Sequence, residues 1–108
     1  NSESFFALYK KLSILSETVS DEAEQLEQRI KLVMQMKKVA KTKRDKLMVK
    51  FMELQMDLLG GNYAVIEQIQ ALILELLVIC ANDATVLYEA ASFYVMMQQF
   101  GEGTFSKI

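Results

Sequence analysis

An apolar residue recurs at every seventh position through the first half of the chain, from Phe5 to Leu54. Seven residues are close to two turns of an α-helix, so these side chains form one stripe along a helical surface. No proline or glycine interrupts the stripe, and the chain contains no proline at all. The pattern predicts long helices whose apolar side packs against other helices. The stripe consists of Phe5, Leu12, Val19, Leu26, Val33, Ala40, Leu47 and Leu54.

The apolar positions beside the stripe change along the chain. Leu8 and Leu15 stand three residues after a stripe residue, whereas Ile30, Phe51 and Leu58 stand four residues after one. A two-stranded coiled coil keeps both of its seams at constant spacing. A drifting apolar face is instead expected when straight helices of period 3.6 pack in a globule. The sequence therefore favours a globular helical bundle over a coiled-coil zipper.

Capping residues and glycines divide the chain into four predicted helices. Ser20 is a good N-cap, and the acids that follow it suit the positive end of a helix dipole. Gly60-Gly61 and Asn82-Asp83 mark two further breaks. A single rod over residues 4–59 is the alternative for the first half. We predict an all-α bundle, one domain over residues 1–108, with helices at about 4–17, 20–59, 62–81 and 83–100.

The third predicted helix, over residues 62–81, is apolar on nearly every side. Such a helix normally lies at the centre of a bundle or is covered at an interface. Its longest apolar stretch, Leu72 to Ala81, is interrupted by Glu75 and is too short to span a bilayer. We therefore expect no transmembrane segment.

The stretch from Leu76 to Gly103 resembles the junction between two tetratricopeptide repeats. In that family a helix ends, an Asn-Asp turn follows, and the next helix carries a large residue, small residues and then an aromatic. Here Ala81 stands where the family usually has proline, and Leu87 where it has tryptophan. The resemblance implies a pair of packed helices and covers about a quarter of the chain. The matching residues are Asn82-Asp83, Leu87, Ala90-Ala91, Tyr94 and Phe100.

Charge is unevenly distributed along a chain whose net charge is only −2. Nine of the twelve basic residues lie between Arg29 and Lys50, whereas residues 17–27 contain five acids and no base. The chain is 52% hydrophobic, more than so small a domain buries alone, which indicates a partner or a second copy. The single cysteine, Cys80, has apolar neighbours, so we predict a buried residue and an intracellular, cytoplasmic protein. Because the sequence starts at Asn1 rather than methionine, we expect either a domain excised from a longer protein or a trimmed chain.

Enzymatic chemistry has little support in the sequence. The chain has no histidine, which removes Ser/His and Cys/His nucleophiles and histidine-containing metal sites. Paired carboxylates such as Asp21/Glu24 are most simply a solvated helix face. We predict a protein that is not an enzyme and carries no cofactor and no metal.

The predicted function is protein interaction through the apolar faces, either by homodimerisation or by binding a partner helix. Adaptors, assembly factors and chaperones fit this description, and the charge asymmetry would orient the partner. Five methionines in residues 34–56 act either as core filler or as an adaptable binding surface. The residues predicted to contact the partner are Leu26, Ile30, Val33, Leu47, Phe51, Leu54 and Leu58.

The alternative function is nucleic-acid or phosphoinositide binding through a basic patch. Lysine and arginine side chains at helical spacing can follow a row of phosphates. The competing explanation is that these charges are solvated or pair with the acids of residues 17–27, in the same chain or in a second copy. The basic patch consists of Lys37, Lys41, Lys43, Arg44, Lys46 and Lys50.

Overall fold

The computed structural model describes residues 4–100, which fold into six α-helices and one short 3-10 turn and contain no strand. This confirms the all-α prediction, although six helices stand where about four were predicted. None of the helices in residues 4–100 combines the length and the apolar content needed to cross a bilayer. The elements are α1 (Phe5–Ser13), α2 (Leu15–Thr18), α3 (Glu22–Val39), α4 (Lys43–Leu59), η1 (Tyr63–Val65), α5 (Ile66–Ile79) and α6 (Ala84–Phe100).

The first half of the chain is broken near residue 20, as predicted, so a single rod over residues 4–59 is excluded. The N-cap of α3 is Asp21 rather than Ser20, and its carboxylate accepts a hydrogen bond from the Glu24 amide at 3.0 Å. The predicted helix over residues 4–17 is two helices, because the chain departs from helical geometry at Ile14.

The prediction of one helix over residues 20–59 is wrong, because the chain turns between α3 and α4. Thr42 caps α4, and its hydroxyl accepts a hydrogen bond from the Asp45 amide at 3.0 Å. Ala40 has extended backbone angles and ends α3 without glycine or proline. The missed signal was the spacing of Thr42 and Asp45, a threonine followed three residues later by an acid. The turn folds α4 back against α3, so both halves of the stripe enter one core.

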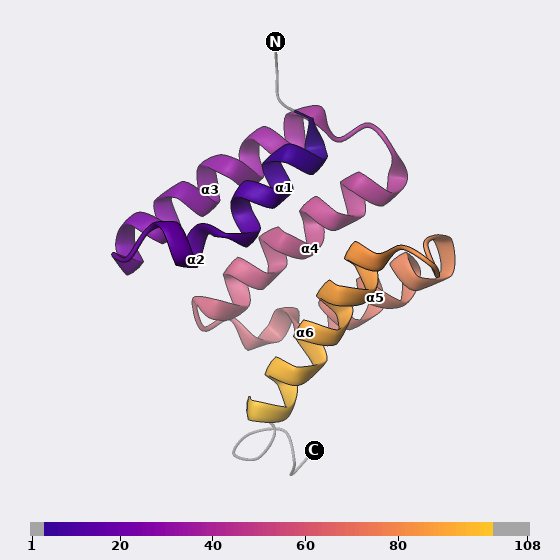
Figure 1. Ribbon diagram of the computed structural model, residues 1–108. Helices are drawn as coiled ribbons and strands as arrows, with labels where there is room; N and C mark the ends of the chain where they lie inside the picture. The colour runs from indigo at the N-terminus through magenta and orange to yellow at the C-terminus, as the bar shows by residue number, and fades with distance from the viewer. Residues whose placement is uncertain (1–3, 101–108) are drawn as a thin grey trace.

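Helix α4 runs through the middle of the molecule, between the pair formed by α1 and α3 and the pair formed by α5 and α6 (Figure 1). Met48 and Phe51 of α4 are almost completely buried. The Phe51 ring meets the ring of Phe93 from α6 edge-on, with the ring centres 6.4 Å apart. The helix over residues 62–81 was expected to lie at the centre of the bundle or at an interface; among the described elements the central helix is α4. Residues of all six helices contribute to the same core.

Most of the seven-residue stripe lies in this core. Val33, Ala40 and Leu54 are buried along with Leu12, and Phe5, Val19 and Leu47 pack against the core as half-buried residues. Leu26 is the exception, with 52% of its surface exposed. Three of the five clustered methionines, Met36, Met48 and Met52, are core filler, whereas Met34 is exposed.

The second half of the chain begins at the predicted glycine turn. Gly61 has a φ of 102°, which favours glycine, and the Asn62 side chain accepts a hydrogen bond from the Ala64 amide at the start of η1. The predicted Asn-Asp break also separates α5 from α6. Asp83 accepts hydrogen bonds from the amides of Thr85 and Val86 at 3.0 and 3.2 Å, which caps α6. Residues 101–108 of the predicted tail lie outside the described part of the chain.

Candidate functional site

Of the seven residues predicted to contact a partner, four are part of the chain's own core. Val33, Phe51, Leu54 and Leu58 are each at most 9% exposed, so their side chains have no surface to offer another protein. The turn at residues 40–42 brings these residues into one core within the chain, whereas a single helix over residues 20–59 would leave them on an open side. Leu47 is half-buried against the core.

The remaining two predicted residues lie on the open side of α3. Leu26 and Ile30 are 52% and 44% exposed, and Met34, one helical turn further, is 58% exposed. Four-residue spacing places these three side chains on one strip of the helix surface. We call Leu26, Ile30 and Met34 the α3 stripe.

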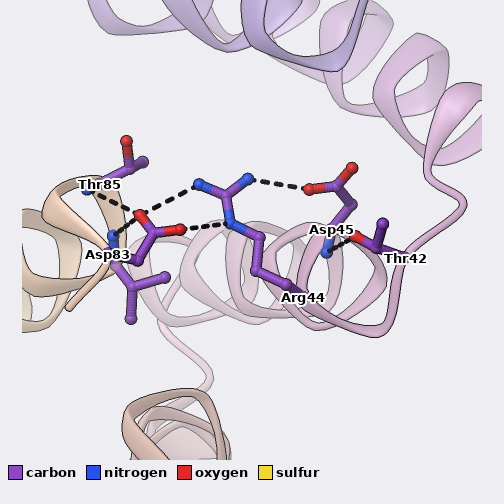
Figure 2. Close-up of polar contacts among 6 residues, drawn as sticks. Thr42, Arg44, Asp45, Asp83 and Thr85 are labelled. Atoms are coloured by element: carbon purple, nitrogen blue, oxygen red, sulfur yellow. Dashed lines mark hydrogen bonds and ion pairs between the residues drawn. The ribbon is translucent and has the colours of Figure 1, made fainter. Parts of the chain in front are cut away.

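Arg44 does not belong to the basic patch in which the sequence placed it. Its guanidinium lies between two carboxylates, as Figure 2 shows, and donates to Asp83 at 3.0 and 3.3 Å and to Asp45 at 2.8 Å. It also lies 5.8 Å from the centre of the Phe5 ring. These contacts join the start of α4 to α1 and to the turn before α6, so the Arg44 guanidinium is already engaged by two carboxylates of the chain.

The Arg44 contacts control the ionisation of Asp83. Partial burial alone raises the pKa of a carboxyl group, but the hydrogen bonds from Arg44 and from the Val86 and Thr85 amides outweigh it, so the pKa of Asp83 lies below its usual value. The same pairing keeps the pKa of Arg44 above its usual value despite its own partial burial. Asp83 therefore stays ionised throughout the neutral range. Its carboxylate keeps its hydrogen bonds with Arg44 and with the Thr85 and Val86 amides.

Two further residues of the predicted basic patch pair with acids other than those expected. Lys37 lies 3.5 Å from Glu53 of α4, and Lys43 lies 3.3 Å from Glu75 of α5. Both lysine side chains are two-thirds exposed, so each ion pair contributes little to stability. Among the described residues, the acids at 17–27 pair with a lysine only through Glu27 and Lys31, four residues apart on α3.

The other lysines of this region are exposed and have no acidic partner within residues 4–100. They are Lys41, Lys46 and Lys50 of the predicted patch, together with Lys38. Lys46 and Lys50 follow one another by one helical turn on α4, and Lys38 and Lys41 lie at the end of α3 and in the turn after it. Three residues of the predicted patch are thus left without an acidic partner among residues 4–100, and with Lys38 they make up the four free lysines.

Helix α6 exposes several large apolar residues. Val86, Ala90 and Phe93 of this helix are buried. The opposite side carries large apolar residues that residues 4–100 leave exposed. The side chains described for this helix include one charge, Glu89, which is half-buried. We call the exposed residues of this side the α6 face. They are Leu87 (45% exposed), Tyr88 (65%), Ala91, Tyr94 (43%) and Val95 (55%).

Leu87, Ala91 and Tyr94 are among the residues that carry the tetratricopeptide resemblance, but the sequence analysis predicts no partner contact for them. The signal that distinguishes this face is the lack of charge. A helix surface that faces water ordinarily carries lysine, glutamate or arginine. Helix α5 also exposes apolar residues, Leu74 and Val78, but it carries the exposed acids Glu67 and Glu75 as well.

A groove of about 250 Å³ lies beside the α6 face, between α1, α3, α4 and α6. Tyr88 and Leu59, both about two-thirds exposed, are among its lining residues. Deeper in the groove the Tyr9 hydroxyl donates to the Glu89 carboxylate at 2.7 Å. Burial and this hydrogen bond to an anion raise the pKa of Tyr9 well above its usual value, so the pair stays intact at neutral and alkaline pH.

Residues 4–100 contain no group of three or more metal-ligating side chains. Cys80 is a free thiol and is half-buried rather than fully buried as predicted. The features that need an explanation are therefore surfaces: the α6 face, the α3 stripe and the four free lysines.

Comparisons of the chain with models of protein families, with curated proteins and with solved structures give no match. The resemblance to tetratricopeptide repeats therefore has no support from a family model, although its Asn-Asp turn lies where expected.

Proposed function

We propose that this protein is a helical protein-interaction module that binds a partner helix along the α6 face. The observation that supports the proposal is the composition of that face: Leu87, Tyr88, Tyr94 and Val95 are all at least 43% exposed, and no charged side chain stands among them. Adaptor, assembly-factor and chaperone roles all use such a surface. We place the module inside the cell, where a free thiol such as Cys80 stays reduced.

The exposed apolar residues of α6 are a contiguous row and not a scatter. Leu87, Ala91 and Tyr94 are separated by four and three residues, and Tyr88 and Val95 continue the row on its flank. Together they expose roughly 400 Å², which is within the range of the largest apolar patches on monomeric proteins, patches that are often functional. A partner helix with apolar residues at three- and four-residue spacing would fit against this row.

The two tyrosines make the face suitable for binding in a second respect. Tyrosine combines a large apolar ring with a hydroxyl group and has few rotatable bonds, so it is ordered by a partner at low entropic cost. Tyr94 also packs its ring edge-on against the buried Phe93, with ring centres 5.7 Å apart, which fixes its direction before any partner arrives. A preorganised aromatic residue is typical of the residues that dominate binding energy.

The proposal is tested by site-specific photo-crosslinking in cells that express the protein. A photoreactive residue at position 87 or 94 is expected to give a discrete protein adduct, identified by mass spectrometry. A photoreactive residue at position 46, on the exposed side of α4, is the matched control. The adduct should disappear when Val95 is changed to Glu and should persist when Lys46 is changed to Glu. A folded protein that gives no adduct from either α6 position refutes the proposal.

Nucleic-acid or phosphoinositide binding is a second candidate, and the four free lysines support it. Lys38, Lys41, Lys46 and Lys50 would each release a counterion on meeting a phosphate, so binding would weaken steeply with salt. We expect the double substitution Lys46→Glu and Lys50→Glu to abolish a shift of RNA, DNA or phosphoinositide vesicles. If the unaltered protein binds none of these probes at about 50 mM salt, where such contacts are strong, this candidate is removed.

A further inference from the structure

We infer that the α3 stripe is the contact surface for a second copy of this chain, with the two α3 helices antiparallel across a two-fold axis near Ile30. This goes beyond the proposed function, since the stripe and the α6 face are different surfaces with different occupants. The stripe consists of Leu26, Ile30 and Met34, which are 44% to 58% exposed. Leu26 is also the one residue of the seven-residue stripe that the chain's own core does not cover.

The first argument is the charge pattern of α3 itself. Its first turn carries Glu22 and Glu24, and its last turn carries Lys37 and Lys38. Two such helices side by side in the same direction would place like charges together. In the antiparallel direction, the acidic end of each helix meets the basic end of the other, which is favourable at both ends of the contact. The charge pattern of α3 is therefore complementary to itself, as a two-fold interface requires.

The second argument is the register. Ile30 lies at the midpoint of α3, with Leu26 and Met34 four residues to either side and Glu22 and Lys38 eight residues to either side. An axis through Ile30 therefore sets Leu26 of one copy against Met34 of the other, and Glu22 against Lys38. Each of these contacts occurs twice.

Helical geometry supports the same pairing. Eight residues carry the chain about 12 Å along the axis and about 80° past two full turns. Glu22 and Lys38 therefore lie at equal angles on opposite flanks of the stripe. Between exactly antiparallel helices a two-fold axis would leave the two side chains of a pair on opposite sides of the interface. They come together when the helices cross at about −50°, because rows of residues four apart then lie alongside one another and Glu22 and Lys38 belong to the same row as the α3 stripe. Both are exposed, and neither has an oppositely charged partner within residues 4–100.

The size of the surface predicts the strength of the association. Three half-exposed apolar side chains and the stems of the charged residues around them bury roughly 1,000 Å² over both copies, at the low end for specific complexes. We expect a dimer that dissociates in the micromolar range and weakens as salt rises, because its outer contacts are exposed ion pairs.

Sedimentation velocity over a concentration series tests the inference by charge reversal. Glu22→Lys and Lys38→Glu each create two like-charge contacts in the dimer, and each is expected to weaken it at least about tenfold. An equimolar mixture of the two variants should recover the dimer. In the mixed dimer the lysine introduced at position 22 of one chain faces the glutamate introduced at position 38 of the other, and the two unaltered side chains, Lys38 and Glu22, face each other.

Two kinds of control accompany the charge reversal. The protein with both substitutions in one chain should dimerise like the unaltered chain, because every contact again joins opposite charges. Glu67→Lys on α5 and Lys46→Glu on α4 are the matched single substitutions outside the stripe and should leave the dimer unchanged.

Three results would overturn the inference. One is an unaltered protein that stays monomeric at millimolar concentration. Another is a dimer that both single variants leave intact, and the third is a mixture that fails to recover it. Ile30→Glu, which places two like charges on the axis, gives a further check: it should yield a folded monomer whose adducts from α6 persist. If Ile30→Glu abolishes the dimer while the adducts from α6 remain, the dimer contact and the partner contact are separate. Failure of one proposal can then be told apart from failure of the other.

Discussion

Replacing Arg44 by methionine tests the central polar contact of the fold. The substitution keeps the long apolar stem, which lies near the Phe5 ring, and removes the guanidinium that joins Asp83 and Asp45. The thermodynamic consequence is the loss of three charge-assisted hydrogen bonds of 2.8 to 3.3 Å. Asp83 keeps its hydrogen bonds from the Thr85 and Val86 amides, so α6 stays capped in the variant.

The expected cost follows from the geometry and the exposure of these groups. A hydrogen bond to a charged group contributes about 1.5–3 kcal/mol when it is shielded from water. The side chains of Arg44 and Asp83 are 24% and 28% exposed, so solvent screening lowers this figure. We expect Arg44→Met to reduce the free energy of unfolding by about 1–2 kcal/mol. For a chain of this length, each kcal/mol corresponds to a fall of roughly 4–8 °C in Tm.

Urea denaturation followed by circular dichroism measures this change. Lys46→Met, two residues away on the same helix and exposed, is the control and should change stability by less than about 0.5 kcal/mol. A double-mutant cycle with Asp83→Ala isolates the coupling between the two side chains from the loss of the α6 cap.

The pH dependence gives the same contact a second signature. Because the pKa of Asp83 in the folded protein lies below its unfolded value, the stabilisation is present above an unfolded pKa of about 3.9 and is lost as the pH falls through the folded value. The difference between the unaltered protein and Arg44→Met should therefore be constant near neutral pH and shrink below about pH 4. A variant as stable as the Lys46→Met control, or a difference that does not change with acidification, would refute this account of Arg44.

Three further substitutions test the fold by the same denaturation assay. Phe93→Ala removes a ring with no exposed surface that packs on Phe51, and should cost about 3–5 kcal/mol; a loss under about 1 kcal/mol would mean that α6 is not packed as described. Thr42→Ala removes the cap of α4 and should cost about 1 kcal/mol, whereas Thr42→Ser should cost much less. Gly61→Ala should destabilise by about 1 kcal/mol through its φ of 102° alone, since nothing lies within 4 Å of an added Cβ; equal stability of the two proteins would contradict this backbone geometry.

The helical class and most breaks could be predicted from local signals in the sequence. Gly60-Gly61 and Asn82-Asp83 combine residues that favour turns and caps, and each break lies where these residues stand. The turn at Thr42 was missed because neither glycine nor proline marks it, and because the apolar stripe continues through Ala40 without losing its phase. A seven-residue repeat does not distinguish one long helix from two helices folded against each other, since both bury the same side.

The surfaces could be predicted less well, because burial depends on which helices meet. Phe51 and Leu58 are equally apolar whether they face a partner or the chain's own α5 and α6, and only the packing shows that they are core. Arg44 has the same charge as its neighbour Lys43, yet one of the two carboxylates it bonds lies 39 residues away in the sequence. Contacts of that kind leave no trace in local spacing.

The hydrogen bond between Tyr9 and Glu89 has a consequence for the kinetics of folding. It joins residues 80 positions apart, whereas the packing of α1 on α3, α3 on α4, α4 on α5 and α5 on α6 joins helices that follow closely in the chain. Local contacts close short loops and form early, while a contact between distant segments forms only after the elements between them are ordered. Interactions absent from the transition state act on the unfolding rate. We therefore expect Tyr9→Phe to speed unfolding and to leave the folding rate nearly unchanged, which stopped-flow denaturation would measure.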